Sequence, residues 1–199
     1  TGQRRLQAGE IRAIGTRYTA TRAEARQHKI RYLPEEPLRN ACAPKMSVAD
    51  NLAFKMFDVR RNGRPAFWCS RKDMARNADR LIAEFNVKTT SPDARIASLS
   101  GGNVQRAVLG RELTGEVNAL IISNPCFGLD FGAVSAIRDR IIEARNNGTA
   151  VLLISENLDE IMELSDRILV MSEGRIAFET TAAAADLTEI GQHMAGHAA

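Results

Sequence analysis

The sequence predicts an α/β fold in which a mainly parallel sheet carries a helical subdomain. Its second half alternates short apolar runs, at 119–122, 149–154 and 167–171, with helical patterns at 100–113 and 133–145. Continuous apolar strands that alternate with helices are typical of a parallel sheet covered on both faces. The stretch 36–92 lacks this alternation, and we interpret it as a mainly helical insertion.

The first third of the chain predicts short elements. Residues 8–15, AGEIRAIG, alternate in polarity like a strand between two glycines. Residues 21–30 have the pattern of a polar amphipathic helix. Residues 30–33 then favour a short strand, which must end before Pro34.

Two helices are predicted within the insertion. Ser47 is a good N-cap and Asp50 follows it in capping-box position, so a helix is expected over 47–56. A loop is expected at 62–65, before a second helix at 71–87. The apolar residues of that helix fall on one face. They are Met74, Ala78, Leu81, Ile82 and Phe85.

The last third predicts a short helix at 157–165, a strand at 167–171, a tight turn at Gly174 and a further strand at 175–179.

Composition excludes several classes of protein. A net charge of +3 and 5% aromatic residues, without basic and aromatic residues interleaved, argue against a dedicated nucleic-acid binder. No apolar run approaches the ~18 residues that span a bilayer. Cys42, Cys69 and Cys126 are scattered, so we expect reduced thiols rather than a disulfide framework or a zinc site. No metal site is predicted.

Residues 99–106 read LSGGNVQR and allow two interpretations. Ser100 could simply cap the helix that follows it by accepting hydrogen bonds from the first free amides. The same residues could instead bind an anion. Gly101 and Gly102 let the backbone approach a ligand closely, the helix N-terminus aims its free N–H groups outward, and Arg106 adds positive charge.

The neighbouring motifs favour the second interpretation. LSGGNVQRAVLGREL is followed by ALIISNPCFGLD and by VLLISENLDEIMELSDRILVMSEGRI. Over essentially all of residues 1–180, this order closely resembles the nucleotide-binding domain of ABC transporters. In that family LSGGQxQR is the signature motif, the next strand is Walker B and GLD is the D-loop. YLPEEP matches the Q-loop, and SVADNLAF matches the piece that faces the membrane subunit. The Asn103 variant, with a degenerate Walker B, resembles the second, C-terminal domains of fused ATPases that serve simple-sugar and nucleoside importers.

The resemblance implies an organisation and a setting. It implies a partial P-loop NTPase core of the ABC, RecA-like type at 1–35 and 93–180, a helical subdomain at 36–92 and a C-terminal helical tail at 181–199. It also implies ATP and Mg²⁺ in the full assembly, an N-terminal or second nucleotide-binding domain and permease subunits as partners, and a peripheral place on the cytoplasmic side of the cell membrane. Candidate permease contacts are Phe54, Met56, Phe57 and Trp68, although core packing would explain any one of them.

The P-loop that the resemblance implies, GxxxxGK[ST], is not found. None of the fourteen glycines is followed by Lys-Ser or Lys-Thr, and the chain begins with Thr. We therefore expect the chain to begin just after the P-loop and to bind nucleotide weakly or not at all by itself. The missing strand would leave a sheet edge with which a second copy of the chain could pair.

Further positions depart from the family pattern. Active members end the Walker B strand in Asp-Glu, and Ser123 and Asn124 match those positions. A hydroxyl is a poor ligand for Mg²⁺ and an amide cannot accept a proton near neutral pH. The switch histidine is matched by Glu156, which would repel phosphate by roughly 1 to 4 kcal/mol at contact distance unless protonated or paired. The Q-loop glutamine is matched by Glu35. A surface or capping role would explain any one departure, but together they predict a degenerate catalytic site.

The signature, by contrast, is almost intact. In ABC proteins two nucleotide domains stack head to tail, and each ATP lies between the P-loop of one and the signature of the other. The resemblance therefore implies that Ser100, Gly101, Gly102 and Asn103 bind the ATP phosphate of a partner's site. Asp130 of the D-loop would set geometry across the interface, and the helix tip would supply transition-state electrostatics in trans.

Two other hypotheses stay open at this point. One is a non-catalytic regulatory or scaffold domain of an ABC-type assembly. The other is an ABC protein of DNA repair or translation, although the chain shows neither a long coiled-coil insertion before the signature nor two domains joined by a basic linker. The motifs do not choose between sugar and nucleoside as cargo.

Overall fold

The computed structural model describes residues 6–55 and 70–196, in two compact units, Thr1–Leu152 and Leu153–Ala199. Three candidate permease contacts, Met56, Phe57 and Trp68, and the loop expected at 62–65 lie outside the described residues. The expected subdomain boundaries at 36–92 and 181–199 stay predictions.

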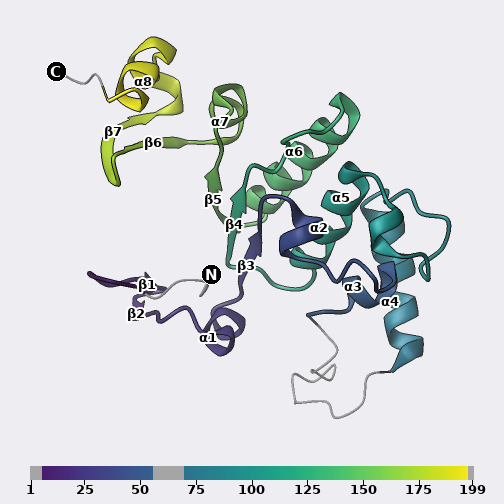
Figure 1. Cartoon of the computed structure of the whole chain (residues 1–199). Coiled ribbons are helices and arrows are strands. Elements are labelled where there is room, and N and C mark those ends of the chain that lie inside the picture. The colour runs from purple at the N-terminus through teal and green to yellow at the C-terminus, as the bar shows by residue number, and fades with distance from the viewer. Residues whose placement is uncertain (1–5, 56–69, 197–199) are drawn as a thin grey trace. The chain divides into compact units, whose positions relative to one another are not determined.

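The central sheet has the strand order β3-β4-β5 (Figure 1). Strand β3 (Ile30–Leu33) runs parallel to β4 (Ala119–Ser123), with Leu33 opposite Ile122, and β5 (Ala150–Ile154) lies on the other side of β4. Leu33, Leu120 and Ile122 are fully buried. The α/β class and the parallel pairing expected from the apolar runs are thus confirmed.

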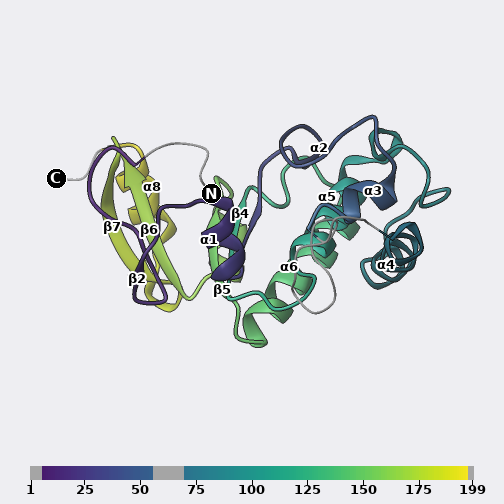
Figure 2. The ribbon, with the colours of Figure 1, turned by 90° about the horizontal axis from the view of Figure 1, so that it is seen from below.

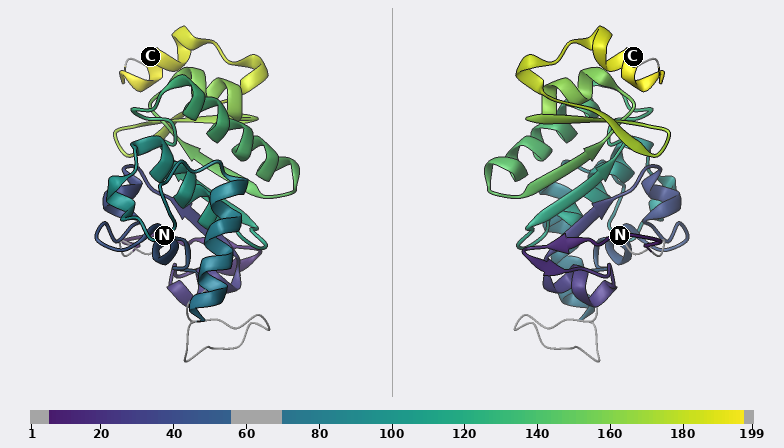
Figure 3. Two further views of the ribbon diagram at one scale, coloured as in Figure 1. Left: turned by 90° about the vertical axis from the view of Figure 1, so that its right-hand side faces the viewer. Right: turned by 90° about the vertical axis from the view of Figure 1, so that its left-hand side faces the viewer.

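Helices α5 (Gly101–Glu112) and α6 (Phe131–Asn146) lie along one face of this sheet (Figures 1 and 3). Crossovers between parallel strands are right-handed, so successive steps in one direction along a sheet place both helices on the same side. Leu152 and Ile154 of β5 are 53% and 52% exposed. These two side chains of β5 are therefore not covered by the described residues, and coverage of both faces of the sheet stays a prediction.

The insertion contains α2 (Pro37–Asn40), α3 (Val48–Leu52) and α4 (Arg71–Glu84). The Ser47–Asp50 capping box is formed as predicted, although α3 ends at Leu52 rather than at 56. The start of α3 is tied to the segment before the signature. Val48 N donates to Ala94 O at 2.9 Å and Ile96 N donates to Met46 O at 3.1 Å. Ile96 begins the short 3₁₀ helix η1 (Ile96–Ser98), which leads directly into α5.

Charged residues at the end of α5 hold the insertion in place. Arg111 and Glu112 are only 5% and 1% exposed. The Arg111 guanidinium donates to Glu112 Oε1 at 2.9 Å, to Ala41 O at 2.9 Å and to Asn51 O at 3.2 Å. Lys55 Nζ lies 3.3 Å from Glu112 Oε2. Breaking such a buried pair leaves an uncompensated charge, so this cluster fixes how the insertion meets α5.

The N-terminal segment corrects one prediction. Residues 8–15 do not form one strand. They contribute β1 (Arg12–Ala13), which pairs antiparallel with β2 (Thr16–Arg17) across Ile14 and Gly15. Both turn residues have positive φ, 51° and 75°, which is typical of a two-residue hairpin turn. The helix expected at 21–30 is confirmed as α1 (Arg22–Gln27).

The second unit contains α7 (Leu158–Leu164), β6 (Arg167–Ser172), β7 (Arg175–Thr181), η2 (Ala182–Ala184) and α8 (Leu187–Met194). The tight turn predicted at Gly174 joins β6 to β7, which pair antiparallel in a sheet of their own. Figure 2 shows α8 beside this hairpin, where Ile190 packs with Ile168 and Val170. Among the described helices, none combines the length and the apolar character that a membrane span requires.

The contact between α4 and α5 predicts a stability difference between two glycine variants. A Cβ on Gly110 would lie 2.7 Å from Phe85 Cδ2, whereas a Cβ on Gly191 in α8 meets nothing within 4 Å. Gly110→Ala should lower the free energy of unfolding by about 1–2 kcal/mol, because overpacking outweighs the gain in helix propensity. Gly191→Ala should raise it by about 0.5–1 kcal/mol. Urea denaturation of both variants checks this, and equal stabilities would contradict the close packing at Phe85.

Candidate functional site

The signature motif forms the N-terminal tip of α5. Ser100 is the N-cap, with extended backbone angles, so the predicted helix start is confirmed. Ser100 and Gly101 are exposed. The Ser100 side chain accepts no hydrogen bond from the helix amides, so the interpretation of Ser100 as a simple cap is wrong. The first amides of a helix have no intrahelical acceptor and carry its positive partial charge, so this exposed tip suits an anion.

Asn103 holds the Ser100 side chain. Its Nδ2 donates to Ser100 Oγ at 2.9 Å, and its Oδ1 accepts from the backbone N–H of Lys88 at 2.8 Å. The amide group that was predicted to meet phosphate is therefore engaged at both ends within the chain. A direct contact of Asn103 with phosphate stays a prediction.

The D-loop lies against the signature glycines. Leu129 Cδ2 is 3.8 Å from the position that a Cβ would take on Gly101, and 3.9 Å from the one on Gly102. The next residue, Asp130, is the N-cap of α6 and accepts from Ala133 N at 2.9 Å. The structure thus places Leu129 of the D-loop motif against the signature glycines, and the role of Asp130 across an interface stays a prediction.

Hydrogen bonds join α5 to residues on either side of the D-loop. Gln105 Nε2 is buried and donates to Pro125 O at 2.8 Å. The Arg106 guanidinium donates to Gly132 O and to Asn86 O, each at 3.3 Å. The sequence suggested Arg106 only as a positive charge near an anion, but its guanidinium also joins α5 to the start of α6.

The degenerate Walker B residues lie at the carboxyl edge of the sheet. Ser123 ends β4, and Asn124 follows with a left-handed φ of 44°. Because Leu33 pairs with Ile122, Glu35 and Asn124 leave the same edge of two adjacent parallel strands. Ligands of open α/β sheets bind at that edge. The hydroxyl and amide there are neutral, and Glu35 is exposed.

Glu156, at the switch position, is exposed and belongs to the second unit. The residues beside it form a small network. Ser155 Oγ donates to the buried Glu160 Oε2 at 2.6 Å and accepts from Asn157 N at 3.1 Å. Across the described ranges, 6–55 and 70–196, no three His, Cys, Asp or Glu side chains gather as a metal ion would require.

Two aromatic residues beside the D-loop were missed by the sequence argument. Phe127 is 74% exposed, and Phe131, the first residue of α6, is 96% exposed. Large apolar side chains in such positions mark contact surfaces when they cluster. The signal was available in the sequence, because the two residues flank the Gly-Leu-Asp turn in a chain with few aromatics.

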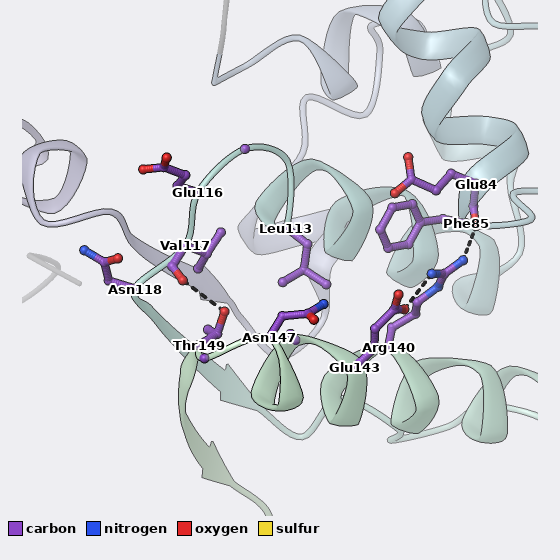
Figure 4. Close-up of a pocket in the computed structure, with 13 residues that line it drawn as sticks. Glu84, Phe85, Leu113, Glu116, Val117, Asn118, Arg140, Glu143, Asn147 and Thr149 are labelled. Atoms are coloured by element: carbon purple, nitrogen blue, oxygen red, sulfur yellow. Dashed lines mark hydrogen bonds and ion pairs between the residues drawn. The ribbon is translucent and has the colours of Figure 1, made fainter.

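A cavity of about 400 Å³ lies elsewhere on the first unit, where α4, α5 and α6 end (Figure 4). Three carboxylates line it, those of Glu84, Glu116 and Glu143. Each is already paired within the chain, with Arg80, Lys29 and Arg140 respectively. Asn118, which precedes β4, also lines it, so the cavity opens at the edge of the sheet opposite Ser123. This cavity is therefore not the candidate site.

Cys42 and Cys126 form no disulfide, in agreement with the reduced thiols expected at these two positions. The pKa of the Cys42 thiol is raised to about 11, chiefly by burial, with Arg111 lowering it and Glu112 raising it by smaller amounts. Cys42 therefore stays protonated at neutral pH and cannot act as a thiolate nucleophile.

Comparison with protein families gives one match that covers most of the chain. Residues 1–126 match the family model described as ABC transporter. The glucose import ATP-binding protein TsgD13 of Haloferax volcanii is 37% identical over 198 residues, which are 98% of this chain and 36% of that protein. The nucleoside import ATP-binding protein NupA of Lactococcus lactis is 34% identical over 98% of this chain and 39% of its own length. The chain thus spans less than two-fifths of these relatives.

Solved structures agree on the fold. The dimeric, post-hydrolysis structure of the ATP-binding cassette MJ0796 bound to ADP and Pi has a TM-score of 0.73 at 16% identity, over 88% of this chain and 74% of that one. The ADP conformation of MJ1267, an ATP-binding cassette of an ABC transporter, has a TM-score of 0.69 at 21% identity, over 98% and 76%. At these identities the likeness shows the fold of an ATP-binding cassette.

The contact between α5 and α6 predicts different costs for alanine at the two signature glycines. A Cβ on Gly102 would lie 3.0 Å from Ala133 Cβ, whereas one on Gly101 would be at ordinary distance from Leu129. Gly102→Ala should therefore cost about 1 kcal/mol more unfolding free energy than Gly101→Ala. Adding Ala133→Gly to Gly102→Ala should cost less than the sum of the two single changes. Chemical denaturation of the four variants measures both effects, and strict additivity would show that the helices do not touch there.

Proposed function

The chain belongs to the ABC transporter family, and from that premise we propose that it is a nucleotide-binding domain that lends its signature to a partner. In this proposal its own catalytic edge is inert. The exposed tip at Ser100, Gly101 and Gly102 completes an ATP site whose P-loop, Mg²⁺ ligand and general base come from another domain.

One contrast supports the proposal above the others. The tip keeps Ser100, Gly101 and Gly102 and is held in place by the contacts of α5 with residues beside the D-loop, while the catalytic edge has hydroxyl and amide where active members have carboxylates. A domain that had lost its function altogether would be expected to lose both the signature residues and the catalytic carboxylates. The tip acts through backbone N–H groups and one hydroxyl, which can stabilise charge on a phosphate that another domain holds.

The chemistry of the catalytic edge agrees with inertness. Ser123 offers a neutral hydroxyl where a hard divalent ion prefers carboxylate oxygen. Asn124 offers an amide, which cannot take a proton from an attacking water at neutral pH. The 199 residues also contain no GxxxxGK[ST] segment to cradle phosphates. ATP and Mg²⁺ would therefore be bound by the assembly, and only weakly by this chain alone.

The relatives suggest the setting of that assembly. The two relatives described above are import ATP-binding proteins, one for glucose and one for nucleosides. We accordingly place this domain in an import system for a sugar or a nucleoside. It would act with permease subunits at the cytoplasmic side of the membrane and with a nucleotide-binding domain that carries an intact P-loop.

The exposed aromatic pair would form part of the surface that meets this partner domain. Leu129 contacts the signature glycines, and Phe127 and Phe131 lie two residues to either side of it. In the proposal, a domain that presents phosphate to Ser100 therefore also faces the segment that carries both rings. Burying one phenylalanine contributes about 1.5–3 kcal/mol, which would favour pairing.

Ser100→Arg is expected to lower the ATPase rate of the assembly by about two orders of magnitude or more. The long cation fills the space of the phosphate and removes a transition-state donor. The rate is measured on this chain combined with its P-loop partner and permease. Asn146→Arg, at the exposed far end of α6, is the matched control and should leave the rate unchanged. If Ser100→Arg changes nothing, the chain is a scaffold rather than a signature donor.

Phe131→Ala is expected to weaken ATP-dependent association with the P-loop partner by about tenfold or more, because the apolar ring is no longer buried. Sedimentation of the two domains with Mg-ATP gives the dissociation constant. Leu187→Ala removes a half-exposed apolar side chain from α8 and should not affect association. Equal affinities for the two variants would remove the aromatic pair from the interface.

A further inference from the structure

The side chain of Asn103 makes two hydrogen bonds, one to a residue before the signature and one to the signature serine. Its side chain reaches the backbone N–H of Lys88, which follows α4, and the hydroxyl of Ser100 at the tip of α5. The orientation of the amide is set by chemistry, because the Lys88 N–H can only donate. Oδ1 must therefore face Lys88, which leaves Nδ2 to face Ser100.

This orientation decides what the Ser100 hydroxyl can do. A serine hydroxyl has one proton to donate and two lone pairs that accept. In a capped helix the oxygen accepts from the N2 or N3 amides, which then cannot serve a ligand. Here the oxygen accepts from Asn103 Nδ2 and makes no cap bond. The amides of Gly101 and Gly102 therefore receive no cap from Ser100, whereas the Asn103 N–H already donates to the Ser100 carbonyl at 3.0 Å. The hydroxyl proton is free to point away from Asn103.

We infer that Asn103 is a positioning residue, which turns Ser100 from a helix cap into a donor aimed at an anion. The inference rests on the proposed function, since the anion is the terminal phosphate of an ATP held by the partner domain. Asn103 acts through Ser100 and needs no phosphate contact of its own. Lys88 contributes through its backbone N–H, so this arrangement requires Asn103 but no particular side chain at position 88.

The hydrogen bond from Asn103 would keep the Ser100 hydroxyl in a donating orientation before any phosphate binds. Without Asn103 the hydroxyl would turn back onto the amides, as Thr21, Ser47 and Ser70 do at the starts of α1, α3 and α4. Those three serine and threonine caps accept from the N3 amide in this same chain. Among the serine and threonine N-caps of the described α-helices, Ser100 is the one that makes no such bond, and its hydroxyl is the one held by a neighbouring amide, that of Asn103. Thr181, at the 3₁₀ helix η2, also makes no cap bond.

A double-mutant cycle tests the inference on the assembly with its P-loop partner and permease. Ser100→Ala, Asn103→Ala and the double variant are compared with wild type for kcat and KM in Mg-ATP hydrolysis. Asn103→Ala should lower kcat about tenfold, and Ser100→Ala should lower it at least as much. In the Ser100→Ala background, Asn103→Ala should have no further effect, because its target is gone. Asn77→Ala on α4 is the matched control, expected to hydrolyse at the wild-type rate.

A second readout needs no catalysis and uses the chain alone. The side-chain NH₂ resonances of Asn103 should shift in Ser100→Ala without nucleotide, while thermal melting shows that the variant is folded. Unshifted resonances would overturn the inference.

The kinetic outcomes separate two failures. If Ser100→Ala hydrolyses ATP at the wild-type rate, the proposed function fails and the inference fails with it. If Ser100→Ala is impaired but Asn103→Ala is not, only the inference fails. If the two losses simply multiply in the double variant, Asn103 acts independently of Ser100, and the inference is again overturned.

Discussion

The close approach of α5 to α6 at Gly102 and Ala133 is the constraint on which the site depends. Only a glycine allows the two helices this spacing without displacement. At that spacing Gln105 reaches the Pro125 carbonyl, the Arg106 guanidinium reaches Gly132, and Leu129 lies on the signature glycines. The tip of α5 is therefore held from several sides although its donors are exposed. Pre-set donors of this kind avoid reorganisation when charge develops.

The signature tip and the catalytic edge of the sheet depend on different kinds of chemical group. A helix tip binds an anion through backbone amides, so its function survives substitution at most neighbouring positions. A metal and water site depends on particular carboxylates and is lost when hydroxyl and amide replace them. The neutral edge at Ser123 and Asn124 and the intact tip at Ser100 can therefore coexist in one stable fold. Neither the buried Arg111–Glu112 cluster nor the α5–α6 contact involves the lost carboxylates.

Much of this arrangement could be predicted from the sequence, and the failures have physical causes. The strands β3, β4 and β5, the helices α5 and α6 and the Ser47 cap follow from local periodicity and capping. The hairpin at Ile14 and Gly15 was missed because alternation alone does not show a turn with two positive φ angles. The placement of α5 and α6 on the same face depends on crossover geometry, which an apolar run does not encode. Local pattern predicted Ser100 as a cap, but a longer-range contact, from Lys88 through Asn103, overrides that preference.

The central claim is that the Gly101 and Gly102 amides meet a phosphate held by another domain. Backbone amide NMR of this chain, titrated with a non-hydrolysable ATP analogue and Mg²⁺, measures that contact directly. The Gly101 and Gly102 resonances should shift only when the P-loop partner is also present, and those of the Ser123–Asn124 edge should stay in place. A shift at Ser123 and Asn124 with nucleotide alone, or silent glycine amides in the complete mixture, would contradict the account.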